Sequence, residues 1–187
     1  MTRTTPSIDP CAIARDGNWP SLPDSTQGDW FVLRTKSRQE KVLSKDLSAH
    51  GIGNFLPMIS TERVYAGQRF LVELPLFPGY LFLRGSVDDA YYADRTRRIA
   101  QIIRVTDQKR LNGELSSLAT VLSSSQRLDP FPFLKAGVRV EIRCGPLQGV
   151  RGVIEDRTRR HRVILQVDAL GQAVSLEVDA AIVDLID

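Results

Sequence analysis

The hydrophobic pattern of the chain changes its period near residue 135, which divides the sequence into two folded parts. Before that point, short apolar runs typical of buried strands alternate with segments in which apolar residues recur every three or four positions, as in amphipathic helices. After it, apolar and polar residues alternate, which predicts strands. We therefore expect an α+β domain followed by a small all-β domain.

Polar residues suited to helix N-caps predict the starts of three helices in the first part. Ser37 and Glu40 have the spacing of a capping box, Ser86 can cap a second helix, and Asn112 a third. The third helix shows the clearest apolar face, with leucine or alanine at 115, 118, 119 and 122. The predicted strands cover residues 30–33, 54–59, 61–65, 69–74, 80–83 and 101–105.

The second part predicts a small β-barrel. Apolar residues alternate over 138–142, 163–167 and 174–178, and glycines separate these stretches. A domain of this size is close to the lower limit for independent folding, and a closed barrel suits it better than an open sheet. The valine and isoleucine content favours strands over helices here.

Proline and serine content sets the domain boundaries. Residues 1–28 contain four prolines and no apolar period, which predicts a flexible tail. Residues 125–134, with Pro130 and Pro132, are predicted to be a linker. The two folded domains are then expected at 29–124 and 135–187.

Composition and charge exclude several classes of function. Among 187 residues, 25 basic and 22 acidic side chains give a net charge of +3, too small for a histone-like nucleic-acid binder. The excess lies in residues 28–124, with 14 basic and 10 acidic groups, so this part is the expected contact for any nucleic acid. No apolar run is long enough for a membrane helix and the first residues lack the core of a secretory signal, so we expect a cytoplasmic protein without membrane contact.

The sequence contains no recognisable catalytic or metal-binding motif. Cys11 and Cys144 are the only cysteines, and His50 and His161 lie far from both in sequence. Neither a phosphate-binding loop nor an H-E-x-x-H motif occurs. We expect a non-enzymatic protein with no catalytic residues, no metal and no cofactor.

Two motifs, one in each predicted domain, resemble those of a known protein family. The first part has Trp30, Arg38 and Glu40 followed by the segment Phe77-Pro78-Gly79-Tyr80. The second has the loop Gly145-Pro146-Leu147-x-Gly149-x-x-Gly152-Val153. Residues 30–187 therefore resemble the NusG family of transcription elongation factors. The resemblance implies a NusG N-terminal-type α/β sandwich followed by an SH3-like KOW barrel.

Short stretches resemble the specialised paralogues of this family. Residues 35–41 are similar to UpxY-type proteins, and 56–59 and 75–82 resemble RfaH; LoaP is a further member of this group. Such paralogues suppress pausing and termination on selected operons. Two alternatives remain open: a general NusG-type factor that aids Rho termination or couples transcription to translation, and an RNA- or ribosome-binding KOW protein.

The resemblance also implies site residues. Trp30, Phe77, Pro78, Gly79 and Tyr80 would bind the clamp helices of the largest RNA polymerase subunit, although their aromatic side chains could instead belong to the core. A factor placed there, expected to be a monomer, would also face upstream or non-template DNA. Cations near a helix start suit phosphates. Candidates for DNA binding are Lys36, Arg38 and Lys41, with a second basic cluster at Arg95, Arg97 and Arg98.

The KOW resemblance implies a partner-binding loop. Its residues are Gly145, Leu147, Gly149 and Gly152, with Leu147 as the apolar tip. The general factor typically has an aromatic residue at this tip for a ribosomal protein or Rho, so leucine puts both partners in question. The alternative is a loop that only closes the barrel. The basic stretch 157–162 is expected to be a solvated hairpin turn.

Overall fold

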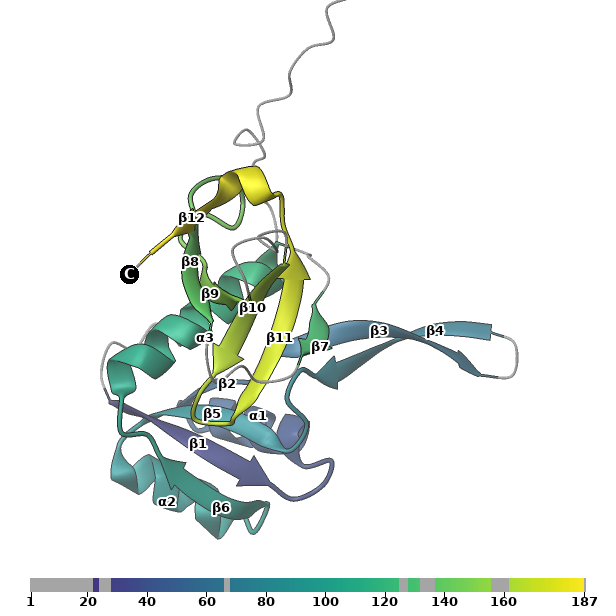
Figure 1. The fold of residues 1–187 in the computed structure, drawn as a ribbon. Helices are drawn as coiled ribbons and strands as arrows, with labels where there is room; N and C mark the ends of the chain where they lie inside the picture. The colour runs from purple at the N-terminus through teal and green to yellow at the C-terminus, as the bar shows by residue number, and fades with distance from the viewer. Residues whose placement is uncertain are drawn as a thin grey trace, which may run out of the picture.

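The computed structural model describes residues 22–23, 28–65, 68–124, 128–131, 137–155 and 162–186. Two antiparallel sheets, a two-stranded ribbon and three helices make up this part of the chain (Figure 1). The N-terminal elements are β1 (Asp29–Thr35), α1 (Glu40–Ala49), β2 (Gly53–Phe55), β3 (Met58–Tyr65), β4 (Gln68–Pro75), β5 (Tyr80–Gly85), α2 (Val87–Arg95), β6 (Ile99–Arg104) and α3 (Gln108–Ser123). The C-terminal elements are β7 (Asp129–Phe131), β8 (Val138–Ile142), β9 (Arg151–Ile154), β10 (Arg162–Val167), β11 (Gln172–Glu177), a short 3₁₀ helix (Ala180–Ile182) and β12 (Val183–Leu185).

The N-terminal sheet has the strand order β2-β5-β1-β6, and all its pairs are antiparallel. Alternate residues of β1 point to opposite faces, as strand geometry requires. Phe31 and Leu33 pack with α1 and α2 in one apolar cluster, whereas Trp30 and Val32 pack with α3 in the other. Both faces are covered, which explains why β1 is apolar in consecutive positions. The α+β expectation for this part is confirmed.

Strands β3 and β4 form a separate ribbon that extends away from the body of the molecule (Figure 1). Their pairing runs from Met58↔Pro75 to Tyr65↔Gln68 without a break. The predicted hairpin is therefore present, although its turn at 66–67 lies outside the described residues. The single strand predicted at 54–59 is wrong, because the chain leaves β2 at Phe55 and starts β3 at Met58, on either side of Pro57.

The C-terminal sheet, β7 to β12, has the strand order β12-β8-β9-β10-β11-β7. Its strands confirm that this part is β rather than helical. The predicted linker 125–134 is wrong in one respect, since Asp129–Phe131 forms β7 and pairs with β11. Within the described residues no pairing joins β7 to β12, so the sheet is open between these two strands and the predicted closed barrel is not confirmed.

The two sheets share one apolar core. The cluster that contains Trp30, Phe77 and Phe82 continues through α3 into the C-terminal sheet, where Val140 and Val163 belong to it. The C-terminal sheet lies on the same side of the N-terminal sheet as α3, opposite α1 and α2 (Figure 1). Leu22, in the predicted flexible tail, also packs against this core; the rest of that segment up to residue 27, apart from Pro23, lies outside the described residues.

Two of the three predicted helix starts are wrong. Helix α1 has Gln39 at its N-cap with no side-chain cap bond, so Ser37 and Glu40 form no capping box. Helix α3 begins after Asp107, whose side chain accepts a hydrogen bond from the Arg110 N–H, and Asn112 lies inside the helix. Ser86 caps α2 as predicted, in a capping box with Asp89. None of the described helices is long and apolar enough to cross a membrane.

Candidate functional site

The segment Phe77–Tyr80 forms a tight turn at the entry to β5. The Tyr80 N–H donates to the Phe77 carbonyl at 3.2 Å, and Gly79 has a φ of 85°, which glycine adopts without strain. Two bonds fix this turn to the chain around α1. The Gly79 carbonyl accepts from the Thr35 N–H at 2.8 Å, and the Gly79 N–H donates to Glu40 Oε1 at 2.7 Å.

Glu40 has a role that the sequence did not indicate. Its side chain is buried, and its carboxylate binds the turn instead of capping its own helix. A buried carboxylate is retained where it accepts hydrogen bonds, because an unpartnered one is costly. The only signal in the sequence was an acidic residue in the first helical turn, which is more commonly a cap or a dipole partner.

The aromatic candidates are less exposed than a binding surface requires. Trp30 and Phe77 are each 2% exposed and belong to the apolar core, so neither presents its ring to solvent in this structure. Tyr80 is half-buried against the same core, and Pro78 is exposed. Of the five predicted polymerase-binding residues, Pro78, Gly79 and Tyr80 are therefore the ones that reach the surface.

Trp30 joins β1 to α3 by polar as well as apolar contacts. Its indole N–H donates to Asn112 Oδ1 at 3.1 Å, and its backbone N–H donates to Gln108 Oε1 at 2.6 Å. The Arg84 guanidinium lies 5.2 Å from the ring centroid, within cation–π range. These contacts favour the core alternative for Trp30.

The predicted DNA-binding residues lie at the start of α1, beside the turn. Lys36 and Arg38 are exposed, and Lys41 is exposed but donates from Nζ to the Glu73 carbonyl at 2.8 Å. The second basic cluster lies next to the first, because the Lys36 N–H donates to the Arg98 carbonyl at 2.8 Å. We call Lys36, Arg38, Arg97 and Arg98 the basic surface. The first three are exposed, and Arg98 is half-buried with its guanidinium donating to Gln39 Oε1 at 2.7 Å.

Two arginines of this basic surface have left-handed backbone. Arg38 has a φ of 60° and Arg97 a φ of 59°, a region that residues other than glycine rarely adopt. Such positions cost free energy and are more common at functional sites. No local pattern in the sequence indicates either conformation.

The predicted KOW loop has the expected turns but not the expected tip. Gly145 and Gly149 have positive φ values of 88° and 82°, so the loop needs both glycines. Leu147 is 4% exposed and part of the core, so the prediction of an exposed apolar tip is wrong. At Gly152 a Cβ would lie 2.4 Å from Val163 Cγ1, which only glycine avoids. Residues 157–161 of the predicted basic turn lie outside the described residues.

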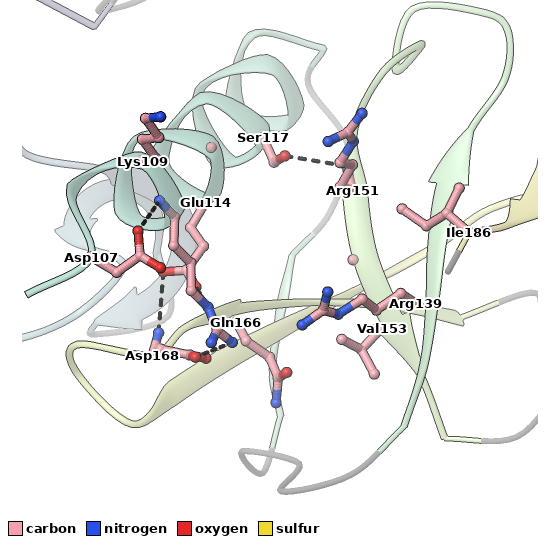
Figure 2. Close-up of a pocket in the computed structure, with 13 residues that line it drawn as sticks. Asp107, Lys109, Glu114, Ser117, Arg139, Arg151, Val153, Gln166, Asp168 and Ile186 are labelled. Carbon is pink, nitrogen blue, oxygen red and sulfur yellow. Dashed lines mark hydrogen bonds and ion pairs between the residues drawn. The ribbon is translucent and has the colours of Figure 1, made fainter.

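A cleft lined mostly by polar and charged side chains lies between α3 and the C-terminal sheet, and the sequence did not predict it. The cleft has a volume of about 460 Å³ and lies between α3 and strands β8, β9 and β10. Figure 2 shows Glu114 and Ser117 reaching from α3 towards the C-terminal sheet. Glu114 Oε2 accepts from the Asp168 N–H at 3.2 Å, and the Ser117 hydroxyl accepts from the Arg151 N–H at 3.2 Å.

Arg110 links two of the three carboxylates that line this cleft. Its guanidinium pairs with Glu114 at 3.1 Å and also with Asp168. Burial and the nearby Asp168 charge raise the pKa of Glu114 to about 7, although Arg110 and the Asp168 N–H oppose the shift. The Arg110–Glu114 spacing of four residues was the only sequence signal.

Comparison with protein families supports the identity of the first half. A model described as NusG, transcription termination factor nusG, matches residues 28–117. The match covers β1 to β6 and the first ten residues of α3, including the turn and the basic surface. Groups of three or more histidine, cysteine or acidic side chains able to hold a metal ion are absent from the described residues. Residues 28–117 of this chain are therefore similar to the NusG family.

Proposed function

We propose that this protein is a non-catalytic transcription elongation factor that binds RNA polymerase and suppresses pausing and termination on selected operons. The NusG-family domain supports a role in transcription elongation or termination in general, and suggests RNA polymerase as a partner. The observation that carries the finer proposal is the Phe77–Tyr80 turn, fixed through Glu40 beside the basic surface.

In this proposal the turn provides the polymerase contact. Pro78 and Tyr80 are accessible enough to meet the clamp helices, while Trp30 and Phe77 support them from the core. Tyr80 packs on the face of the N-terminal sheet that also carries α3 and the C-terminal sheet. Full use of that face therefore requires the C-terminal sheet to move away from it.

The basic surface is proposed to contact upstream or non-template DNA. Lys36 and Arg38 are exposed at the start of α1, and the neighbouring arginines raise the local positive charge. Because the Gly79 turn is bonded to both Thr35 and Glu40, polymerase and DNA contacts would be made by adjacent segments of one rigid unit.

The C-terminal sheet is proposed to be a KOW domain that recruits a partner. Gly145 and Gly149, the two left-handed glycines between β8 and β9, and the close approach at Gly152 fit the loop of that module. Leu147 is buried, so it offers no apolar tip for a ribosomal protein or Rho, which favours a specialised paralogue over the general factor.

Single-round transcription through a Rho-dependent terminator, with purified polymerase and with or without this protein, tests the proposal. We expect more readthrough when the protein is present. Less readthrough would instead support a general NusG-type factor. Failure to copurify with polymerase would favour an RNA- or ribosome-binding KOW protein.

A further inference from the structure

The β3–β4 ribbon, which extends from the body of the molecule, has a free edge on each side (Figure 1). Among the described residues, no third strand pairs with either β3 or β4. An edge strand presents backbone N–H and C=O groups that can pair with another strand. Strand β4 also carries Leu71, which is 77% exposed, and Phe70, which is 48% exposed. Both its backbone and its apolar side chains are therefore available to a strand from outside this fold.

The hydrogen bonds of the ribbon determine which backbone groups of β4 point outwards. At the base of the ribbon the Leu76 N–H donates to the Pro57 carbonyl at 2.8 Å, in register with the β3–β4 ladder. Hydrogen-bonded and non-hydrogen-bonded pairs alternate along an antiparallel ladder, so the N–H and C=O groups that face away from β3 are those of Arg69, Leu71 and Glu73. The bond from Lys41 Nζ to the Glu73 carbonyl agrees with this direction.

We propose that two copies of this protein associate through β4, by antiparallel pairing about a two-fold axis at Leu71. In this register the outward backbone groups of Leu71 bond to those of Leu71 in the second copy. The outward groups of Arg69 likewise bond to those of Glu73 in the second copy, at both ends of the paired segment. The two ribbons then form one continuous antiparallel sheet.

The order of side chains in β4 is self-complementary in this register. The segment reads Arg69-Phe70-Leu71-Val72-Glu73. On one face the two Leu71 side chains lie together, and each Arg69 lies opposite Glu73 of the other copy. On the other face each Phe70 lies opposite Val72 of the other copy, at a non-hydrogen-bonded pair where cross-strand side chains are closest.

Charge complementarity selects the position of the axis. Backbone pairing alone would also allow an axis at Phe70 or at Val72, because either keeps outward groups opposite outward groups. These axes would place Arg69 opposite Leu71 or Pro75 of the second copy, so the unlike charges would not meet. Opposite charges across a strand pair stabilise it, which favours the axis at Leu71.

The ends of the paired segment are also defined. Pro75 has no N–H, so it ends the new ladder on the side of the body. The Glu73 carbonyl can accept from a second donor beside Lys41, since a carbonyl oxygen has two lone pairs. A two-fold axis uses the same edge of both copies, so the contact closes at two copies. The monomer expected from the sequence would then be in equilibrium with a dimer.

Sedimentation velocity of the full chain, from micromolar to millimolar concentrations, tests this inference. We expect a reversible dimer. Arg69→Glu or Glu73→Arg places like charges opposite each other at both ends, and each should raise the dissociation constant about tenfold. An equimolar mixture of the two variants brings unlike charges together again, and should associate as strongly as the unsubstituted protein. Lys45→Glu, an exposed charge reversal on α1, is the matched control and should leave the dissociation constant unchanged.

Recovery in the mixture also shows that neither variant is misfolded. A protein that stays monomeric at millimolar concentration, or that forms larger assemblies in place of a dimer, would overturn the proposal. So would a dimer that tolerates both charge reversals, or two weakened variants that do not recover when mixed. No polymerase takes part in these measurements, so their outcome does not depend on the proposed function.

Disulfide crosslinking reports the register separately. In a Cys11→Ser/Cys144→Ser background, Leu71→Cys should form a covalent dimer on oxidation, because the Cα atoms of a hydrogen-bonded pair lie about 5.5 Å apart. Gln68→Cys, on the same strand and also exposed, lies far from its own copy in this register and should not crosslink. Crosslinking through Gln68→Cys but not through Leu71→Cys would contradict pairing about Leu71.

Discussion

The carboxylate of Glu40 accepts a 2.7 Å hydrogen bond from the backbone N–H of Gly79, across 39 residues of sequence. This bond joins the first turn of α1 to the turn that leads into β5. It also connects the two surfaces on which the proposed function depends, because the basic residues at the start of α1 lie on one side of it and Tyr80 on the other. Its loss should disturb both surfaces together.

Glu40→Ala is expected to lower the free energy of unfolding by about 1–3 kcal/mol, since it leaves the Gly79 N–H without its partner. Urea unfolding measures this change. Glu40→Gln, which retains an acceptor oxygen, should lose less, and Glu73→Ala, which removes an exposed carboxylate, should have little effect. Equal stability of the alanine and unsubstituted proteins would contradict the role assigned to Glu40.

Tyr80→Ala is expected to weaken binding to RNA polymerase while the fold survives, because the ring is only half-buried. Copurification with polymerase and circular dichroism measure the two effects. Tyr91→Ala is the matched control, since Tyr91 is 55% exposed on α2, on the opposite side of the N-terminal sheet. A variant that unfolds would place Tyr80 among the core residues instead.

Arg38→Gly separates DNA contact from backbone strain. It removes one charge of the basic surface but suits a φ of 60°, so crosslinking to upstream DNA should fall while stability is kept or increased. Lys36→Ala should reduce crosslinking as well, and the double variant more steeply. Lys45→Ala, in the second turn of α1, should leave the crosslinking unchanged. Undiminished crosslinking in the double variant would remove the DNA assignment.

Gly152→Ala and Gly113→Ala should change stability in opposite directions. The added methyl at 152 meets Val163 Cγ1 at 2.4 Å and the Ile164 carbonyl at 2.8 Å, and overpacking of this kind costs roughly 1–3 kcal/mol. At 113, inside α3, an added Cβ meets no atom within 4 Å outside the backbone of its own helix, so alanine should stabilise by about 0.5–1 kcal/mol. Thermal unfolding of the two variants checks both signs.

The order of elements could be predicted because local hydrophobic periodicity records which faces are buried. Strand β1 and the apolar face of α3 followed from it directly. Strand β7 could not be predicted, since its three residues include Pro130 and the strand exists only through pairing with β11. A local sequence pattern does not indicate which distant strand pairs with a given segment.

The positions of the candidate site residues could be predicted from the sequence, but the solvent exposure of their side chains could not. The turn at Gly79 and the basic residues near α1 are where the motifs placed them, but Trp30, Phe77 and Leu147 are buried. The sequence does not distinguish an aromatic or aliphatic side chain that packs in a core from one that binds a partner. The cleft around Glu114 depends on how α3 and the C-terminal sheet meet, and neither segment indicates this contact by its own sequence.

The β3–β4 ribbon extends from the body and is built almost wholly from its own cross-strand pairs, with Lys41 bonded to the Glu73 carbonyl near its base. Leu71 and Val64 lie exposed on it. Changes of sequence or length towards its end therefore cost the rest of the molecule little. The arm can therefore change its length or its surface chemistry while the turn and the basic surface near its base keep their arrangement.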